Sequence, residues 1–155
     1  MSSRDAIFRL QAIVGRLKRI DEAVVRWMNR WSVPALRITL AVVFIWFGSL
    51  KVFGLSPAED LIAATVYAVP PDVFIPILGV WEVCIGLCLL YRPLIRIGLL
   101  LLFVQLPGTF LPIVLLPHVV FTAFPYGLTV EGQYIIKNLV IIGAALSVGG
   151  AFRDR

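Results

Sequence analysis

Four apolar stretches, each long enough to cross a lipid bilayer, constrain this chain more than any other feature. They cover residues 33–54, 73–91, 97–116 and 133–150. A helix of roughly 20 apolar residues crosses a hydrocarbon core about 30 Å thick and satisfies its own backbone hydrogen bonds there. Of the 155 residues, 60% are hydrophobic and only 15% are charged, whereas soluble domains carry about 25% charged residues. The sequence therefore predicts an all-α membrane protein, a bundle of four transmembrane helices.

Segments on either side of these stretches complete the predicted domain organisation. Residues 1–32 contain an amphipathic helix over 4–31, with arginines mostly opposite its apolar face. This pattern is typical of a helix in the cytoplasmic membrane interface, and a helix docked on a partner subunit would share it. Residues 33–150 form the four-helix transmembrane domain, in which Ser32 is expected to cap the first span just before Pro34. Residues 151–155 form a cytoplasmic tail.

The predicted connections between spans differ in kind. Residues 56–59, Ser-Pro-Ala-Glu, form a capping box that opens a short helix on the outer membrane surface. Pro70 and Pro71 end that helix before it is long enough to span. Residues 92–96 form a basic turn, and residues 118–131 form an apolar connection that is either a re-entrant cap or an interfacial lid.

The distribution of basic residues predicts the orientation of the chain. Eight Lys and Arg residues precede or begin the first span, two lie between the second and third spans, and two follow the fourth. Residues 55–72 and 118–132 contain none. Lys and Arg accumulate in cytoplasmic loops, so both termini are expected to be cytoplasmic. The net charge of +5 is explained by this orientation, and no nucleic-acid partner is expected.

Polar side chains inside the spans mark the candidate site, in the outer half of the bundle. They are Lys51, Glu82, Gln105, Lys137 and Asn138. A carboxylate in hydrocarbon costs a few kcal/mol or more, so Glu82 is expected to face inward and pair with Lys51 or Lys137. Such a pair can be purely structural. Alternatively it belongs to a ligand site, where two lysines against one carboxylate would favour an anionic or carbonyl-bearing molecule such as a quinone.

Gly79 and Gly86 share the helix face of Glu82 and should let a neighbouring helix approach closely. Cys84 and Cys88 lie on the same predicted helix but away from Glu82, which indicates packing or lipid contact. With His118 as its single histidine, the sequence contains no cluster typical of metal ligands.

Four short motifs resemble in order and spacing the DoxX-like superfamily of small four-span bacterial membrane proteins. They are Arg37 with residues 44–51, then residues 79–86, 124–126 and 131–138. The resemblance covers residues 35–150 and is nearest to the branch linked to reactive-chlorine stress. It implies the bacterial inner membrane. The positions that match the family's polar residues are Lys51, Glu82 and Lys137. Some members of the superfamily are subunits of thiosulfate:quinone oxidoreductases, others associate with thiol and superoxide defence enzymes, and many have no assigned activity.

The function expected from the sequence is therefore a redox- or oxidative-stress-associated membrane component. It would bind a quinone-like or anionic small molecule through Lys51, Glu82 and Lys137, with Gln105 and Asn138 nearby. A different class is a non-catalytic scaffold or subunit that recruits a soluble redox enzyme or another membrane subunit through the basic N-terminal helix. A small transporter is a third class, and it would need a homo-oligomer to form a path. Neither the residues nor the resemblance decides whether the chain is an enzyme.

Overall fold

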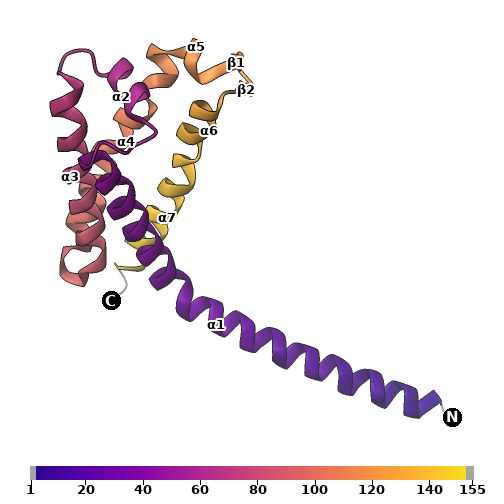
Figure 1. The fold of residues 1–155 in the computed structure, drawn as a ribbon. Coiled ribbons are helices and arrows are strands. Elements are labelled where there is room, and N and C mark those ends of the chain that lie inside the picture. Colours follow the sequence, from indigo (N-terminus) through magenta and orange to yellow (C-terminus); the bar gives the residue numbers. More distant parts are fainter. Residues whose placement is uncertain (1–2, 153–155) are drawn as a thin grey trace. The chain divides into compact units, whose positions relative to one another are not determined.

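The computed structural model describes residues 3–152, and the side chains from residue 14 onward. Within these residues the chain is almost entirely helical, with one short two-stranded hairpin (Figure 1). The elements are α1 Ser3–Val52, α2 Glu59–Thr65, α3 Pro71–Leu90, a 3-10 turn Arg92–Leu94, α4 Ile95–Leu115, α5 Pro117–Val120, β1 Phe121–Ala123, β2 Gly127–Leu128, α6 Val130–Ile136 and α7 Asn138–Ala151.

Four helical stretches are long and apolar enough to cross a membrane, by length and composition. In the described part of the chain these are Val14–Val52, Pro71–Leu90, Arg92–Leu115 and Val130–Ala151. The structure therefore has the four apolar helices that the sequence predicts. The tail predicted at residues 151–155 begins inside α7, which includes Ala151, and residues 153–155 lie outside the described residues.

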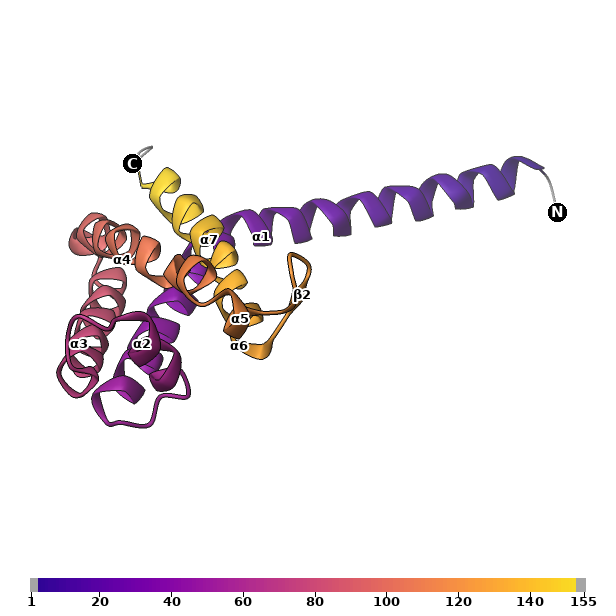
Figure 2. The ribbon, with the colours of Figure 1, turned by 90° about the horizontal axis from the view of Figure 1, so that it is seen from above.

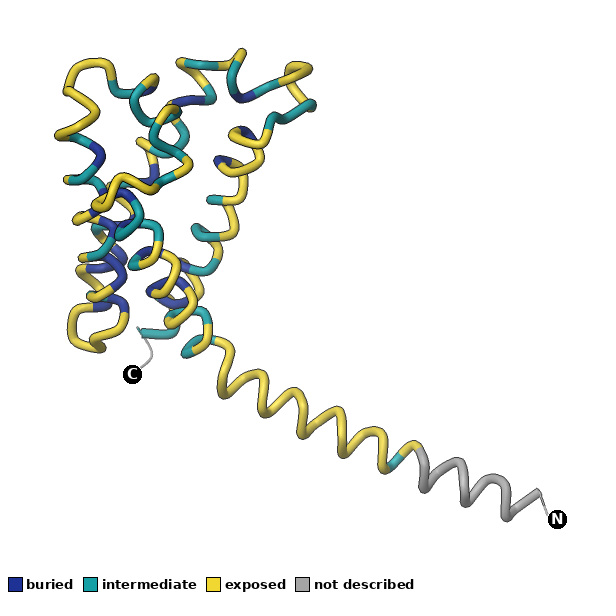
Figure 3. The backbone as a smooth tube through the Cα atoms, in the orientation of Figure 1, coloured by how far each residue is buried: buried dark blue, intermediate teal, exposed yellow. Residues whose placement is uncertain are grey.

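The chain divides into two units after Ala35. In the first unit, residues 16–32 are exposed at every position, the apolar ones included (Figure 3). Helix α1 runs on through Ser32 and Pro34 to Val52, so the prediction that Ser32 caps a separate helix is wrong. A single proline removes only one backbone hydrogen bond and bends a helix more readily than it ends it. No glycine lies near Pro34 to complete a break.

In the second unit, parts of α1, α3, α4 and α7 pack around a core of buried apolar side chains. The core residues are Leu40, Ala41, Phe44, Ile85, Leu89, Ile95, Leu99, Leu102, Leu106, Ala145 and Val148. Most of them lie in the half of the bundle next to the Arg92–Leu94 turn, whereas α2, α5 and the hairpin lie at the opposite end (Figures 1 and 2). This close packing at one end leaves the other half of the bundle open enough for a cavity.

Helices α1 and α3 cross at almost bare backbone. A Cβ atom added to Gly79 would lie 2.6 Å from the Gly48 carbonyl oxygen, and one added to Gly48 would lie 2.6 Å from that of Gly79. A Cβ on Gly86 would lie 2.7 Å from the Ala41 carbonyl oxygen. The close approach predicted from Gly79 and Gly86 is therefore confirmed. Small residues are the means by which helices pack in a membrane, where lipid competes for every apolar contact.

The last predicted span, residues 133–150, forms as α6 and α7, which meet at a local irregularity at Lys137. Lys137 keeps helical backbone angles, but the Val140 N–H donates to its carbonyl at 3.0 Å, a bond three residues along the chain instead of four. Helix α6 also begins three residues earlier than predicted. The Thr129 hydroxyl caps it by accepting from the Gly132 N–H at 3.0 Å. No glycine or proline marks this position in the apolar run, so the sequence pattern alone could not locate the irregularity at Lys137.

The outer connections also differ in detail from the prediction. Helix α2 is shorter than expected, although half of its capping box forms: the Ser56 N–H donates to the Glu59 carboxylate at 3.3 Å. The segment of residues 118–131 contains most of α5 and an antiparallel hairpin that the sequence analysis did not predict. The Thr129 hydroxyl donates to the Val119 carbonyl at 2.7 Å and so fastens α5 to the start of α6.

Candidate functional site

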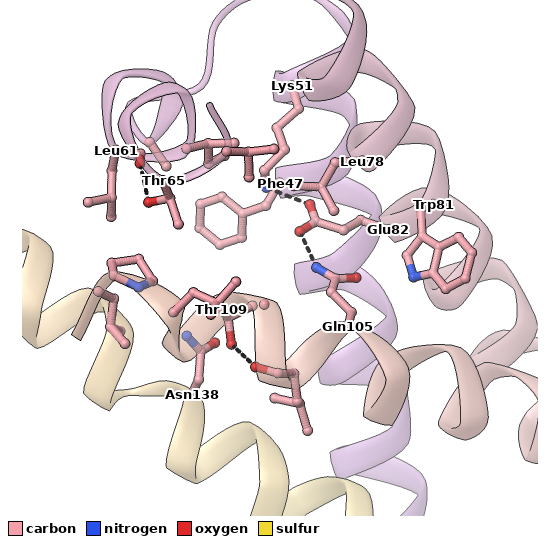
Figure 4. Close-up of a pocket in the computed structure, with 18 of the residues that line it drawn as sticks. Phe47, Lys51, Leu61, Thr65, Leu78, Trp81, Glu82, Gln105, Thr109 and Asn138 are labelled. Carbon is pink, nitrogen blue, oxygen red and sulfur yellow. Dashed lines mark hydrogen bonds and ion pairs between the residues drawn. The ribbon is translucent and has the colours of Figure 1, made fainter. Parts of the chain in front are cut away.

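Three polar side chains from three helices form a row, in which Lys51 and Glu82 are buried and Gln105 is half-buried. The Lys51 ammonium in the last turn of α1 lies 2.5 Å from Glu82 Oε2 on α3. Gln105 Nε2 on α4 donates to the other carboxylate oxygen, Oε1, at 2.7 Å (Figure 4). Only 5% of Lys51 and 7% of Glu82 is accessible. Both oxygens of the carboxylate are therefore engaged, and the two charges neutralise each other within the bundle.

The position of this row follows from the glycine crossing of α1 and α3. Lys51 is one turn after Gly48, and Glu82 is one turn after Gly79, so each charged residue follows a glycine at the crossing. A Cβ on Gly79 would lie 2.9 Å from the Lys51 Cβ, which shows how closely the two backbones approach there. The short distance lets Lys51 reach the carboxylate, and it leaves neither charge facing hydrocarbon.

The row forms part of the wall of a cavity of about 500 Å³. This volume falls within the roughly 300–1,000 Å³ usual for small-molecule sites. Its lining comes from α1, α2, α3, α4, α6 and α7 and is mostly apolar or aromatic, as Phe47, Leu78 and Trp81 illustrate (Figure 4). An apolar cavity with a few polar groups at fixed positions is the usual form of a binding site for a lipophilic molecule.

Asn138 contributes a further polar group to the same cavity. It is the first residue of α7, and no hydrogen bond joins its amide to any other residue drawn in Figure 4. Thr109 on α4 also lines the cavity, and its hydroxyl donates to the Leu106 carbonyl at 2.7 Å. The Asn138 amide thus keeps both its donor and its acceptor available on the cavity side.

Lys137 does not join the other candidate residues. It is exposed and is not among the residues that line the cavity, although its neighbour Asn138 is. The lining residues of this segment are Tyr134, Ile135, Asn138 and Ile141, which share one helix face that excludes position 137. Among the described residues that line the cavity, Lys51 is the only basic one and Glu82 the only acidic one. The cavity wall therefore lacks the surplus positive charge expected from two lysines.

Some cavity residues were missed by the sequence analysis. Tyr134 precedes Asn138 by one helical turn, so helical spacing from a polar residue could have identified it. The α2 side chains Leu61 and Thr65 also line the cavity, and only the tertiary fold brings them there. Two buried polar atoms have no hydrogen-bond partner within residues 14–152: Gln105 Oε1 and Arg37 Nε.

The remaining reactive side chains lie apart from this cavity. Cys84 is exposed and Cys88 half-buried, and both are free thiols outside the cavity lining. His118 is exposed. Over the part of the chain that the structure describes, no group of three or more His, Cys, Asp or Glu side chains is placed to hold a metal ion. The cavity lined by Lys51, Glu82, Gln105 and Asn138 is therefore the candidate functional site.

Comparison with family models, with curated proteins and with solved structures finds no match for this chain. The resemblance to the DoxX-like superfamily stays a prediction from the motifs.

Proposed function

We propose that this chain is a DoxX-like membrane protein that binds a lipophilic small molecule with a quinone-like head group in the cavity of its bundle. The observation that carries this proposal is the buried ion pair of Lys51 and Glu82, joined by Gln105, in the wall of a mostly apolar cavity of about 500 Å³. Ionisable residues inside a membrane bundle are costly, and in most cases they mark a ligand or ion site.

The cavity's parts have distinct roles in this proposal. Its apolar and aromatic lining holds the ring and tail of the ligand. Lys51 donates one hydrogen bond to Glu82 and has two further N–H groups. A carbonyl oxygen on the head group can accept from one of them, or from the Asn138 amide. A charged residue that is already paired with Glu82 provides this donor without leaving an unneutralised charge in the membrane.

The role in redox metabolism or oxidative stress rests on the resemblance to the DoxX-like superfamily. The resemblance also implies a location in the bacterial inner membrane, where quinones dissolve. We assign no electron-transfer step to the chain. In this proposal the protein holds the molecule, and a second protein carries out the chemistry.

We also propose how the chain is oriented in the membrane. The apolar stretch Val14–Val52 is 39 residues long, about twice the length needed to cross a bilayer. Its second half is the span, and residues 4–31 lie along the cytoplasmic interface. Both termini are then cytoplasmic, and α2, α5 and the hairpin lie on the outer side.

A second candidate function is supported by the N-terminal segment. Its large apolar side chains are exposed, with Trp27 at 64%, Met28 at 55% and Trp31 at 50%. Arginine side chains flank them, and the Arg30 guanidinium lies 6.0 Å from the centre of the Trp31 ring. Such a surface suits anionic lipid, or a soluble redox enzyme that the chain recruits as a scaffold.

The experiment that tests the binding proposal uses the full chain purified into lipid nanodiscs. Native mass spectrometry should show a co-purifying lipophilic molecule, and a decyl-substituted benzoquinone should bind saturably in a titration of tryptophan fluorescence, because Trp81 lines the cavity. The double variant Lys51→Met with Glu82→Gln should remain folded and lose most of this binding. Equal binding by the folded double variant, or no saturable binding by the wild type, would overturn the proposal.

A further inference from the structure

We infer that the ligand of this cavity is an uncharged amphiphile taken directly from the bilayer, and that the Asn138 amide is the group that hydrogen-bonds to its polar end. The inference rests on the proposed function and narrows it, because the sequence alone favoured an anionic molecule as much as a neutral one. Three independent observations support it: the charge of the cavity wall, its free hydrogen-bonding capacity, and the exposure of its lining residues on the apolar outer surface.

The charge of the wall excludes a site built for an anion. The Lys51 ammonium is already matched by the Glu82 carboxylate at 2.5 Å, and Lys137, the second lysine expected at the site, is exposed outside the cavity. An anionic head group would therefore enter without a cation to neutralise it, and it would face Glu82. In a medium of low dielectric constant like charges repel strongly, so an uncharged head group is favoured.

Asn138 is the uncharged side chain of the cavity wall that keeps both donors and an acceptor free, whereas Gln105 has only its Oε1 acceptor without a partner and the remaining N–H groups of Lys51 belong to a paired cation. Both oxygens of Glu82 accept hydrogen bonds, and the Gln105 amide nitrogen donates one of them. Thr109 donates its hydroxyl proton to a backbone carbonyl. The Asn138 amide has two N–H donors and one carbonyl acceptor, and it has no hydrogen bond to the other cavity residues in Figure 4. A head group that carries a carbonyl or a hydroxyl can use either end of this amide.

The cavity is lined by residues that are also exposed on the apolar outer surface of the bundle. Ile77 on α3 is 60% accessible and Val104 on α4 is 60% accessible, and Val43 on α1 and Tyr134 on α6 are also exposed. All four helices belong to candidate membrane spans, so in a membrane these exposed residues face hydrocarbon. A charged molecule would have to cross that hydrocarbon at a cost of several kcal/mol, whereas an uncharged amphiphile is already dissolved in it.

The experiment compares two probes with the same alkyl chain on the full protein in nanodiscs. The probes are a decyl-substituted benzoquinone, which is uncharged, and decyl phosphate, which is anionic. The wild type should bind the benzoquinone at least tenfold more tightly than the phosphate. Asn138→Leu keeps a similar side-chain volume but removes the hydrogen bonds, so it should weaken benzoquinone binding about tenfold. Lys137→Gln, at the adjacent exposed position, is the matched control and should bind like the wild type.

The outcomes distinguish a failure of this inference from a failure of the proposed function. If decyl phosphate binds as tightly as the benzoquinone, or if folded Asn138→Leu binds the benzoquinone like the wild type, the inference is overturned while ligand binding stands. If the wild type binds neither probe, the proposed function fails and the inference fails with it. Thermal unfolding in the nanodisc shows whether Asn138→Leu is folded. Should it not be, Asn138→Ala takes the same test with the same expected loss.

Discussion

At the scale of single residues, the ion pair of Lys51 and Glu82 explains how this chain tolerates a carboxylate inside a membrane bundle. Each charge is almost fully buried, and each has the other within 2.5 Å. Gln105 satisfies the second carboxylate oxygen. A buried pair of this kind contributes little net stability compared with apolar residues, but the loss of one partner leaves the other charge stranded.

Lys51→Met and Glu82→Gln should therefore each destabilise the protein by about 3–5 kcal/mol, the usual effect of stranding one buried charge. The double variant should recover most of that loss, because no charge is then left without a partner. Unfolding of the purified variants in mixed micelles with increasing denaturing detergent measures the difference. Lys137→Met is the control and should have a small effect, since Lys137 is exposed. Strictly additive losses in the double variant would contradict the pairing.

At the scale of elements, the crossing of α1 and α3 determines where the polar row forms. The backbones touch at Gly48 and Gly79, and the two charged residues follow one turn later on each helix. Any side chain at the crossing has to push the helices apart, because the nearest atom it meets at either glycine is a carbonyl oxygen of the opposite backbone, which cannot rotate away. The geometry of the site thus depends on residues that have no polar group themselves.

Gly79→Val should destabilise the fold by about 1–3 kcal/mol or more, as overpacking does, and should also weaken ligand binding by separating Lys51 from Glu82. Gly143→Ala on α7 is a matched control, since a Cβ there meets nothing within 4 Å. In a helix interior that change should be neutral or slightly stabilising. Detergent unfolding and the benzoquinone titration measure the two effects. A Gly79→Val protein as stable as Gly143→Ala would show that the helices do not cross at bare backbone.

At the scale of the whole molecule, the distribution of buried residues divides the bundle into two halves with different tasks. The half next to the Arg92–Leu94 turn is filled by apolar side chains and holds the helices together. The opposite half contains the cavity, and α2 contributes to its lining. Arg92 and Arg96 lie at the packed end, and the two connections without Lys or Arg, residues 55–72 and 118–132, lie at the cavity end (Figure 1). In the orientation proposed above, the cavity is therefore in the outer half of the membrane.

Reporter fusions or labelling of introduced cysteines in intact cells tests this orientation. Sites at residues 1 and 155 should be inside, and sites near residues 60 and 125 should be outside, because only the latter two connections lack Lys and Arg. Cys84 and Cys88 are first replaced by serine to remove background labelling. An external C-terminus would invert the molecule and place the cavity in the cytoplasmic half.

The amino-acid sequence by itself determined the class of fold, because a hydrocarbon solvent permits few structures for an apolar run of about 20 residues. It also indicated that Glu82 faces inward and that Gly79 and Gly86 permit a close neighbour, since both follow from helical periodicity. It left the partner of Glu82 open between Lys51 and Lys137. Periodicity along one helix carries no information about the distance to another.

Only the tertiary structure decided which polar residues share a space. The crossing at Gly48 and Gly79 selects Lys51 as the partner of Glu82. The shared face of α6 and α7 turns Asn138 into the cavity and leaves Lys137 outside it. These outcomes depend on contacts between residues distant in the chain, which no local pattern in the sequence encodes.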